Sequence, residues 1–234
     1  MRLFSWILLS ILLSFSLAAT AHADKQTDFP FEVGAKAAYS RITFFRGSGI
    51  QGAGKLRSRN SFAAGLSSHY RLHTTKRVHL GVQPELLFVR RGADGELDGR
   101  IVAAWHLSYL EVPALGRVSF PLSGSVSPYI VAGPRFGLLL SAETTDVNGN
   151  VQDGSDSTNT FDFGFSAGAG AVFHVGSGIM VSIDGRYDQS LLNRIKLSTD
   201  EVTNDQRHRA FFLMLGVSMG IGAPAPAVAA SLAH

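Results

Sequence analysis

The stretch Thr160–His174 reads TFDFGFSAGAGAVFH and alternates between two kinds of residue. Its odd positions are all apolar, four of them phenylalanine, whereas its even positions are nearly all small or polar. A period of two is typical of a β-strand with one apolar and one polar face. An ordinary strand has about 5–6 residues, but this alternation is long enough for a tilted strand that crosses a lipid bilayer. The stretch therefore predicts a membrane-spanning strand, which needs partners elsewhere in the chain.

The same alternation recurs along the chain. It predicts further strands near residues 31–44, 61–73, 78–91, 105–120, 128–142, 179–188 and 210–221. Polar or glycine-rich stretches at 47–59, 92–100, 143–159 and 193–206 are typical of long loops, and 74–77, 121–125 and 175–178 of tight turns. Because long and short connections alternate, eight antiparallel strands place all the long loops at one end and all the tight turns at the other. This is the arrangement of an outer-membrane barrel.

The composition of the two strand faces indicates which one lies outside. The apolar faces carry bulky Phe, Leu and Ile, and the opposite faces carry glycine, serine and charged residues. Side chains just fill the interior of an eight-stranded barrel, so bulky residues suit the outside. The sequence therefore predicts an all-β fold, an eight-stranded antiparallel up-and-down transmembrane β-barrel over residues 29–222. A soluble β-sandwich or lipocalin-type barrel is the alternative, with the faces reversed. Pro84, on the apolar face of its strand, predicts a bulge there.

Both ends of the chain depart from this pattern. The N-terminus has Arg2, an apolar run over Leu3–Ala19 and the small-residue exit Ala21-His22-Ala23, as in a secretory signal peptide. We expect residues 1–23 to be cleaved off after Ala23 and the chain to be exported to the outer membrane of a Gram-negative cell; an uncleaved anchor is the alternative. Residues 223–234 form an Ala/Pro-rich C-terminal tail. The chain has no cysteine, which excludes disulfides and thiolate metal sites.

Two predicted strands carry residues that suggest a family. They read YLEVPALGRVSF (Tyr109–Phe120) and SPYIVAGPRFGLLLSAE (Ser127–Glu143). They resemble the PorT-type outer-membrane β-barrel family, in which a Tyr-Leu-Glu-Ile-Pro-like strand precedes a Pro-Tyr-hydrophobic-Gly-Pro strand. The resemblance implies an exported eight-stranded barrel, inserted by the barrel-assembly machinery, and it implies no activity. Such barrels often end on an aromatic residue that this machinery recognises, whereas the present chain continues to His234.

The polar strand faces contain charged residues that the alternation turns into the lumen. An isolated buried ion is very costly, so these charges must pair or be hydrated. We predict an internal salt-bridge network in a barrel that does not conduct; a narrow ion path or a proton relay is the alternative. Gly164, Gly168 and Gly170 are expected to make room for these side chains. The predicted network comprises Glu32, Lys36, Arg71, Glu85, Glu111, Arg117, Arg135, Asp184, Arg186 and Asp188.

The first two predicted long loops are basic. At the outer surface their cations are expected to meet the phosphates of lipopolysaccharide, which arginine can bind with two hydrogen bonds. A solvated rim is the alternative. The candidate contacts are Arg46, Lys55, Arg57, Arg59, Arg90, Arg91 and Arg100. The formal net charge of +3 is too small to indicate a nucleic-acid partner, and the pattern does not predict an oligomeric state.

Cofactor, metal and catalytic motifs are weak. Asp146, Asn148 and Asn150 hint at calcium, but the loop lacks the glycine and the bidentate glutamate of an EF-hand, so a mobile polar loop is predicted. The histidines at 69, 73 and 79 are close enough in the predicted strands to suggest a metal, yet scattered histidines are more often structural. The two G-x-S-x-G matches, Gly164–Gly168 and Gly216–Gly220, both lie within predicted strands and not at a strand-to-helix turn. We therefore expect no cofactor, no metal and no enzyme, with a lipid-modifying enzyme of the outer membrane as the alternative.

Overall fold

The computed structural model describes residues 29–45, 55–58, 60–75, 77–97, 99–122, 125–146, 148–155, 159–176, 178–191 and 207–222. These ranges contain ten β-strands. They are β1 (Phe31–Phe45), β2 (Lys55–Ser58), β3 (Asn60–Thr74), β4 (His79–Leu97), β5 (Arg100–Ser119), β6 (Val126–Asp146), β7 (Val151–Asp153), β8 (Phe161–His174), β9 (Ile179–Ser190) and β10 (Arg207–Ile221). Within the same ranges, no helix has the length and apolar character needed to cross a membrane.

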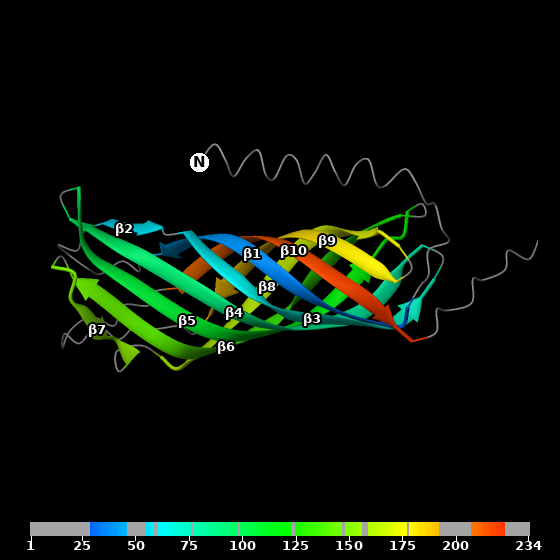
Figure 1. Cartoon of the computed structure of the whole chain (residues 1–234), viewed down its shortest axis with the longest axis horizontal. Coiled ribbons are helices and arrows are strands. Elements are labelled where there is room, and N and C mark those ends of the chain that lie inside the picture. The colour runs from blue at the N-terminus through cyan, green and yellow to red at the C-terminus, as the bar shows by residue number, and fades with distance from the viewer. Residues whose placement is uncertain are drawn as a thin grey trace, which may run out of the picture.

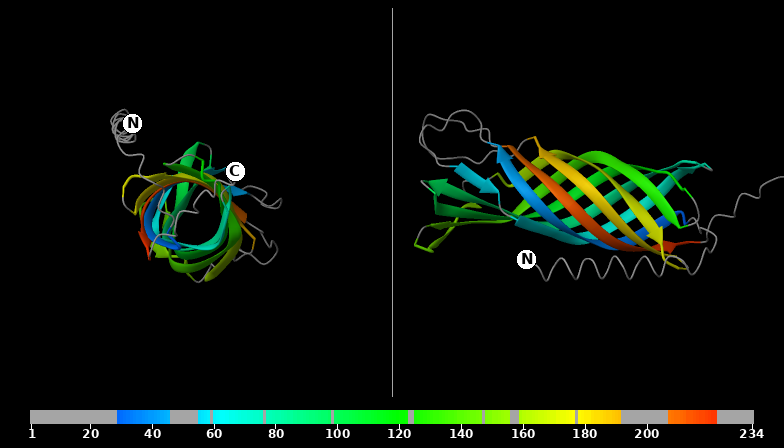
Figure 2. Two further views of the ribbon diagram at one scale, coloured as in Figure 1. Left: turned by 90° about the vertical axis from the view of Figure 1, so that its right-hand side faces the viewer. Right: turned by 90° about the horizontal axis from the view of Figure 1, so that it is seen from above.

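Eight of the described strands close into a barrel (Figure 1). The order around the wall is β1, β3, β4, β5, β6, β8, β9 and β10, and β10 pairs with β1 to complete it. All of these pairings are antiparallel. Figure 2 shows the wall as a ring along its axis and the strands strongly tilted from the side. The predicted eight-stranded antiparallel barrel is therefore confirmed, and its closure removes the unpaired edges of an open sheet.

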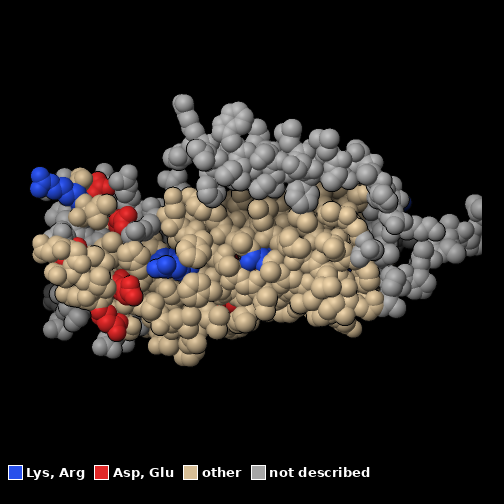
Figure 3. Space-filling model, viewed as in Figure 1, with Lys and Arg blue, Asp and Glu red and all other residues tan. Residues whose placement is uncertain are grey.

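Burial alternates along the strands as the period of two predicts. On β10, Phe211, Leu213 and Leu215 are exposed, whereas Phe212 and Met214 are buried. Exposed Phe, Tyr, Leu, Ile and Val cover the outside of the barrel. On the face shown in Figure 3, charged side chains are sparse over this wall and gather at the end that carries β2 and β7. This is the exterior expected of a barrel in lipid.

One end of the barrel carries three tight turns. In the β3–β4 turn, the Thr75 amide donates to the Val78 carbonyl at 2.9 Å, and in the β8–β9 turn, the Val175 amide donates to the Ile179 carbonyl at 3.0 Å. The third turn joins β5 to β6, where the Phe120 amide donates to the Pro128 carbonyl at 2.8 Å. We call this end the turn end and the opposite end the loop end.

The loop end differs from the predicted long loops. β2 pairs with β4 and β7 pairs with β6, so β4, β5 and β6 extend into a wider sheet there (Figure 1). β4 and β5 form one hairpin, with Gly99 in the turn at a φ of 79°. The predicted loops 47–59, 92–100 and 143–159 are thus wrong in part. Beyond the lipid both faces of a sheet meet water, and the alternation that marks a strand fades.

The predicted bulge at Pro84 is wrong. Pro84 pairs with Ala114, and the β4–β5 register is the same at Leu87, which pairs with Glu111. Glu85 and Leu86, which lie between them opposite Pro113 and Val112, form no β4–β5 pairing. Because proline has no N–H to donate, the ladder has a gap here, but neither strand has an extra residue. Register shifts occur instead between Gly95 and Glu96 in the β4–β5 pairing and between Ser108 and Tyr109 in the β5–β6 pairing.

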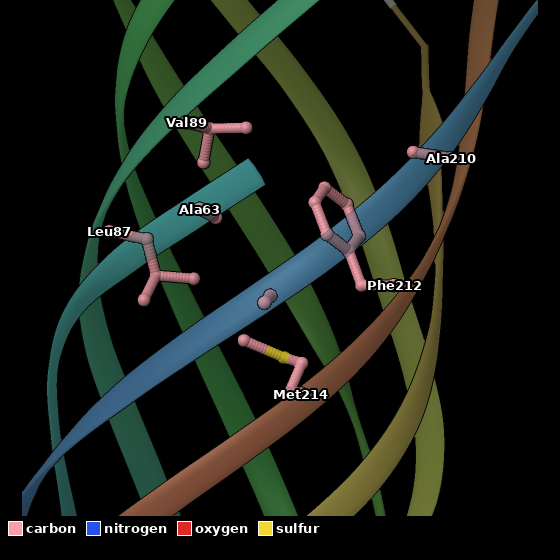
Figure 4. Packing of buried hydrophobic residues seen from close by; sticks show 7 residues of the cluster. Ala63, Leu87, Val89, Ala210, Phe212 and Met214 are labelled. Atoms are coloured by element: carbon pink, nitrogen blue, oxygen red, sulfur yellow. The ribbon is translucent and has the colours of Figure 1, made fainter. Parts of the chain in front are cut away.

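Apolar side chains occupy part of the interior. One buried cluster comes from β1, β3, β4 and β10, and Figure 4 shows its members inside the curve of these strands. A second is formed by β5, β6, β8 and β9. The two clusters comprise Ala38, Ala63, Leu87, Val89, Ala210, Phe212 and Met214, and Leu115, Tyr129, Val131, Val172 and Met180. A third, smaller cluster of Leu107, Tyr109 and Ala142 lies between β5 and β6, and polar groups fill much of the remaining interior.

Candidate functional site

The interior of the barrel holds the charged residues that are buried in the described part of the chain. Eleven are buried and Arg71 is partly buried. The acids are Glu32, Glu85, Glu111, Asp162, Asp184 and Asp188, and the bases are Lys36, Arg71, Arg91, Arg117, Arg135 and Arg186. All ten residues of the predicted lumen network are among them. Six acids face six bases, so the described interior is neutral as a whole.

A first cluster, which we call the loop-end cluster, is centred on Arg135. Its Nη1 donates to Glu111 Oε1 at 2.8 Å and its Nη2 donates to Asp162 Oδ2 at 2.8 Å. Asp188 Oδ2 lies 3.9 Å from Arg135 Nε. Arg91 pairs with Glu111 and lies 3.5 Å from Asp162. Arg135 is 0% exposed, so these partners replace its hydration shell.

A second cluster, the central cluster, is centred on Glu85 and Asp184. Lys36 Nζ lies 3.0 Å from Glu85 Oε1 and 3.1 Å from Asp184 Oδ2. Arg186 pairs with the same Glu85 and donates to Asp184 Oδ1 at 3.2 Å. The Tyr129 hydroxyl donates to Asp184 Oδ2 at 2.8 Å. Two cations and two carboxylates therefore neutralise one another and are held in place by hydrogen bonds.

Arg117 lies nearer the turn end. Its Nη1 donates to Gln83 Oε1 at 2.9 Å and its Nε to Ser119 Oγ at 3.0 Å. Its guanidinium also lies 4.0 Å from the centre of the Tyr129 ring, a cation–π contact. Close to the same end, Arg71 Nη2 donates to Glu32 Oε1 at 2.8 Å. Polar contacts therefore continue along the lumen towards the turn end.

The space left inside is small. Near the turn end, one cavity of about 20 Å³ is lined by Glu32, Lys36, His69 and Arg117, among others, and a neighbouring one is about 10 Å³. A single water molecule needs roughly 10–15 Å³ on this measure. These cavities can hold water, but they are too small for an organic ligand.

The glycines of β8 lie against the charged strands. A Cβ added to Gly164 meets Arg135 Nη2 at 2.8 Å, and one added to Gly170 meets Asp184 Cβ at 2.5 Å. At Gly168 the added atom lies 3.4 Å from Arg186 Cβ. The structure thus places all three glycines beside charged residues of neighbouring strands, as expected.

A comparison with protein families identifies the family of this barrel. The family model for the outer membrane protein beta-barrel domain matches residues 22–196. The chain belongs to this family. The barrel and its apolar exterior thus agree with the family in assigning the protein to the outer membrane.

Solved structures of other outer-membrane barrels are similar to this one. Neisserial surface protein A is 18% identical, with 82% of this chain and 97% of that chain covered and a TM-score of 0.49. OprG from Pseudomonas aeruginosa is 13% identical, with coverages of 86% and 100% and a TM-score of 0.47. The outer membrane enzyme PagL is 13% identical, with coverages of 80% and 99% and a TM-score of 0.40. No curated protein matches the chain.

Two members of the charge network were missed by the pattern of residues. Arg91 was expected at the outer surface as a lipopolysaccharide contact, and this is wrong: it is 2% exposed and pairs with Glu111 inside the outer-membrane barrel. The predicted strand ended at Arg91, yet Arg91 has the same parity as the inward residues Gln83 and Glu85. Asp162 carried a similar signal, because it shares the even positions of β8 with Gly164.

The other candidate lipopolysaccharide contacts have different placements. Arg90 faces outward, with its guanidinium 5.9 Å from the centre of the Phe62 ring, and Arg100 is exposed at the β4–β5 hairpin. Lys55 and Arg57 lie in the short strand β2. Arg46 and Arg59 lie outside the described residues.

The weak metal candidates gain no support. His69 and His79 are buried, while His73 is exposed; among the described residues no group of three metal-binding side chains forms. Asp146 instead shapes the β6–β7 hairpin, because its Oδ1 accepts the amides of Asn148 at 2.8 Å and Asn150 at 2.9 Å. The hydrogen bond from the Asn150 side chain is the main cause that lowers the pKa of Asp146. The predicted mobile loop is, in this part, a hairpin.

Proposed function

We propose that this outer-membrane barrel is non-conducting and has a structural and surface-interacting role. The observation that supports this most is the filling of its lumen. The loop-end and central clusters, together with three apolar clusters, occupy the described interior, and the two cavities near the turn end are only about 20 and 10 Å³. Moving an ion through this lumen requires breaking several buried ion pairs, each of which is costly to separate.

Planar-bilayer recording tests the proposal. Protein extracted from the outer membrane is reconstituted after its folding is verified by heat-modifiable gel mobility. We expect no stable, large conductance steps. Regular steps that scale with salt concentration reject the non-conducting lumen and favour the alternative of a narrow channel.

We further propose that the loop end contacts lipopolysaccharide through Arg46, Lys55, Arg57, Arg59, Arg90 and Arg100. Arg90 supports this, because it is an exposed cation beside Phe62 at the margin of the apolar wall. The test is an Arg57→Gln, Arg59→Gln double variant, measured as the phosphate of lipopolysaccharide that copurifies per barrel. We expect a loss of at least about half. Arg77→Gln at the turn end is the matched control, and equal retention by all three proteins contradicts the contact.

The route to the membrane is part of the same proposal. We propose that residues 1–23 are a signal peptide cleaved after Ala23, that the barrel-assembly machinery inserts the chain, and that it is a PorT-type member of its family. The strands that contain Tyr109–Phe120 and Ser127–Glu143 support the last assignment. N-terminal sequencing of the protein in the outer-membrane fraction is expected to begin at Asp24. A start at Met1 contradicts the cleavage, and recovery in the soluble periplasm contradicts the whole proposal.

A further inference from the structure

The strand register gathers three residues of catalytic type on the outside of the barrel. Leu107 and Tyr109 on β5 are buried in the lumen, so His106 and Ser108, which alternate with them, face outward. On β6, Glu143 pairs directly with His106. Residues opposite each other on antiparallel strands have Cβ atoms about 4.5–5.5 Å apart. A hydroxyl and an imidazole two residues apart, and a carboxylate from the next strand, are thus neighbours on one face.

This group lies at the loop-end margin of the apolar wall. Towards the turn end, the outward residues of β5 continue with Leu110 and Val112, whereas towards the loop end Glu143 pairs with the exposed Asp153. Acyl chains of lipids lie along such a wall, and their ester bonds lie at its margin. Figure 3 shows the same change from a sparsely charged wall to a charged end.

The chemistry of the three residues is complementary. A serine hydroxyl is a weak nucleophile until an adjacent imidazole accepts its proton, and a carboxylate beside the imidazole orients it and stabilises its charged form. In the described structure no hydrogen bond joins Ser108 to His106. The two side chains share one face two residues apart, so rotation of the histidine side chain can bring the pair together when substrate is bound.

A cation is available at the same place. Arg90 on β4 pairs directly with Ser108. It faces outward and is exposed. A guanidinium beside the nucleophile can hold a lipid phosphate or stabilise the oxyanion that forms during acyl transfer.

The backbone is irregular at this point. The β5–β6 register shifts between Ser108 and Tyr109, where Ser108 pairs with Ser141 and Tyr109 pairs with Leu139. Leu140 is therefore an extra residue on β6. Bulges of this kind re-aim side chains and are over-represented beside active sites.

We propose that Ser108, His106 and Glu143 form a serine esterase site for the acyl esters of outer-leaflet lipids. Ser108 Oγ attacks the ester carbonyl carbon as His106 accepts its proton. The carbon–oxygen bond to the alcohol breaks, and His106 returns the proton to the leaving oxygen, leaving an acyl-serine. Water then attacks the acyl carbonyl, His106 accepts a proton from it and passes it to Ser108 Oγ, and the fatty acid is released. Glu143 is a positioning residue for His106.

A fluorophosphonate probe tests the nucleophile in the full-length protein purified in detergent. We expect the wild-type protein to be labelled on the peptide that contains Ser108. Ser108→Ala is expected to abolish labelling, and His106→Gln to slow it by about 10²-fold or more. Ser141→Ala, on the same face and directly opposite, is expected to be labelled as the wild type is. Heat-modifiable mobility confirms that each variant is folded.

Lipid substrates test the activity and separate two sources of the ester. Mixed micelles with phosphatidylethanolamine and micelles with lipopolysaccharide are incubated in parallel, and released fatty acid is measured by mass spectrometry. Release from either one that is lost in Ser108→Ala supports the proposal and names the substrate. An unlabelled wild-type protein, labelling that persists in Ser108→Ala, or release from neither lipid overturns it.

Discussion

Arg135 on β6 and Glu111 on β5 face each other inside the barrel, with Nη1 and Oε1 2.8 Å apart. Both side chains are almost fully enclosed, with 0% and 1% exposure. Arg135 also holds Asp162 from β8, so one guanidinium joins three neighbouring strands of the wall. Arg91 on β4 lies 3.5 Å from the same Asp162, which links strands that are not neighbours in the wall. The loop-end cluster therefore braces the barrel as well as filling its lumen.

Removing the centre of this cluster is expected to destabilise the barrel. Arg135→Ala leaves Glu111 and Asp162 enclosed with one cation fewer, and breaking a buried pair on one side costs roughly 3–5 kcal/mol. The measurement is urea unfolding in lipid vesicles, followed by tryptophan fluorescence and gel mobility. Arg100→Ala, an exposed arginine at the hairpin tip, is the control and is expected to change stability by less than about 0.5 kcal/mol. Equal stability of the two variants contradicts the bracing role.

Close packing of the strands predicts a second contrast. A Cβ at Gly133 lies 2.1 Å from the Ala114 carbonyl oxygen, whereas one at Gly116 has its nearest neighbour at an ordinary 3.6 Å. Gly133→Ala therefore forces β5 and β6 apart, and we expect a loss of about 1–3 kcal/mol. Gly116→Ala is expected to be tolerated. Refolding yield and the unfolding midpoint in urea measure both, and a tolerated Gly133→Ala shows that the wall can relax there.

The sequence predicts which face of the wall a side chain lies on better than it predicts which residue the side chain pairs with. A period of two places Glu111 and Arg135 in the lumen without any knowledge of the neighbouring strands. Their pairing depends on strand register, which brings together residues 24 positions apart. Such a register is fixed by the closure of the whole barrel, and no local pattern encodes it.

The same limit of local sequence patterns explains the wrong predictions at the loop end. The pattern ended one strand at Arg91 because glycine and acidic residues follow, and those residues suggest a loop. The strand in fact continues to Leu97 and carries Arg91 inward. The grouping of His106 with Glu143 was also missed, since 37 positions separate them in the chain and only the β5–β6 register makes them neighbours.

The orientation of the wall predicts the effect of a charge on its outside. Leu215 on β10 is 50% exposed and lies between the buried residues Met214 and Gly216. If this face meets lipid, Leu215→Lys places an ammonium near the middle of the apolar wall. We expect a cost of about 2–4 kcal/mol in vesicles. Leu215→Ala is the control that separates the effect of lost packing from the effect of the added charge. A lysine variant no less stable than the alanine variant contradicts a lipid-facing position.

Acidification is expected to loosen the β6–β7 hairpin. The pKa of Asp146 is lowered, first by the Asn150 side chain and then by backbone amides. A carboxyl whose folded pKa is depressed contributes stability above its ordinary pKa, about 3.9 for aspartate, and loses it as the pH falls through the lower folded value. The Asn148 and Asn150 amides, which donate to this carboxylate, should thus lose their hydrogen bonds only in strong acid. Proton NMR of the reconstituted barrel follows their temperature coefficients from pH 6 to pH 2. Asp146→Asn is expected to remove the pH dependence, because the amide oxygen can still accept but does not titrate. A transition that persists in Asp146→Asn assigns it to another group.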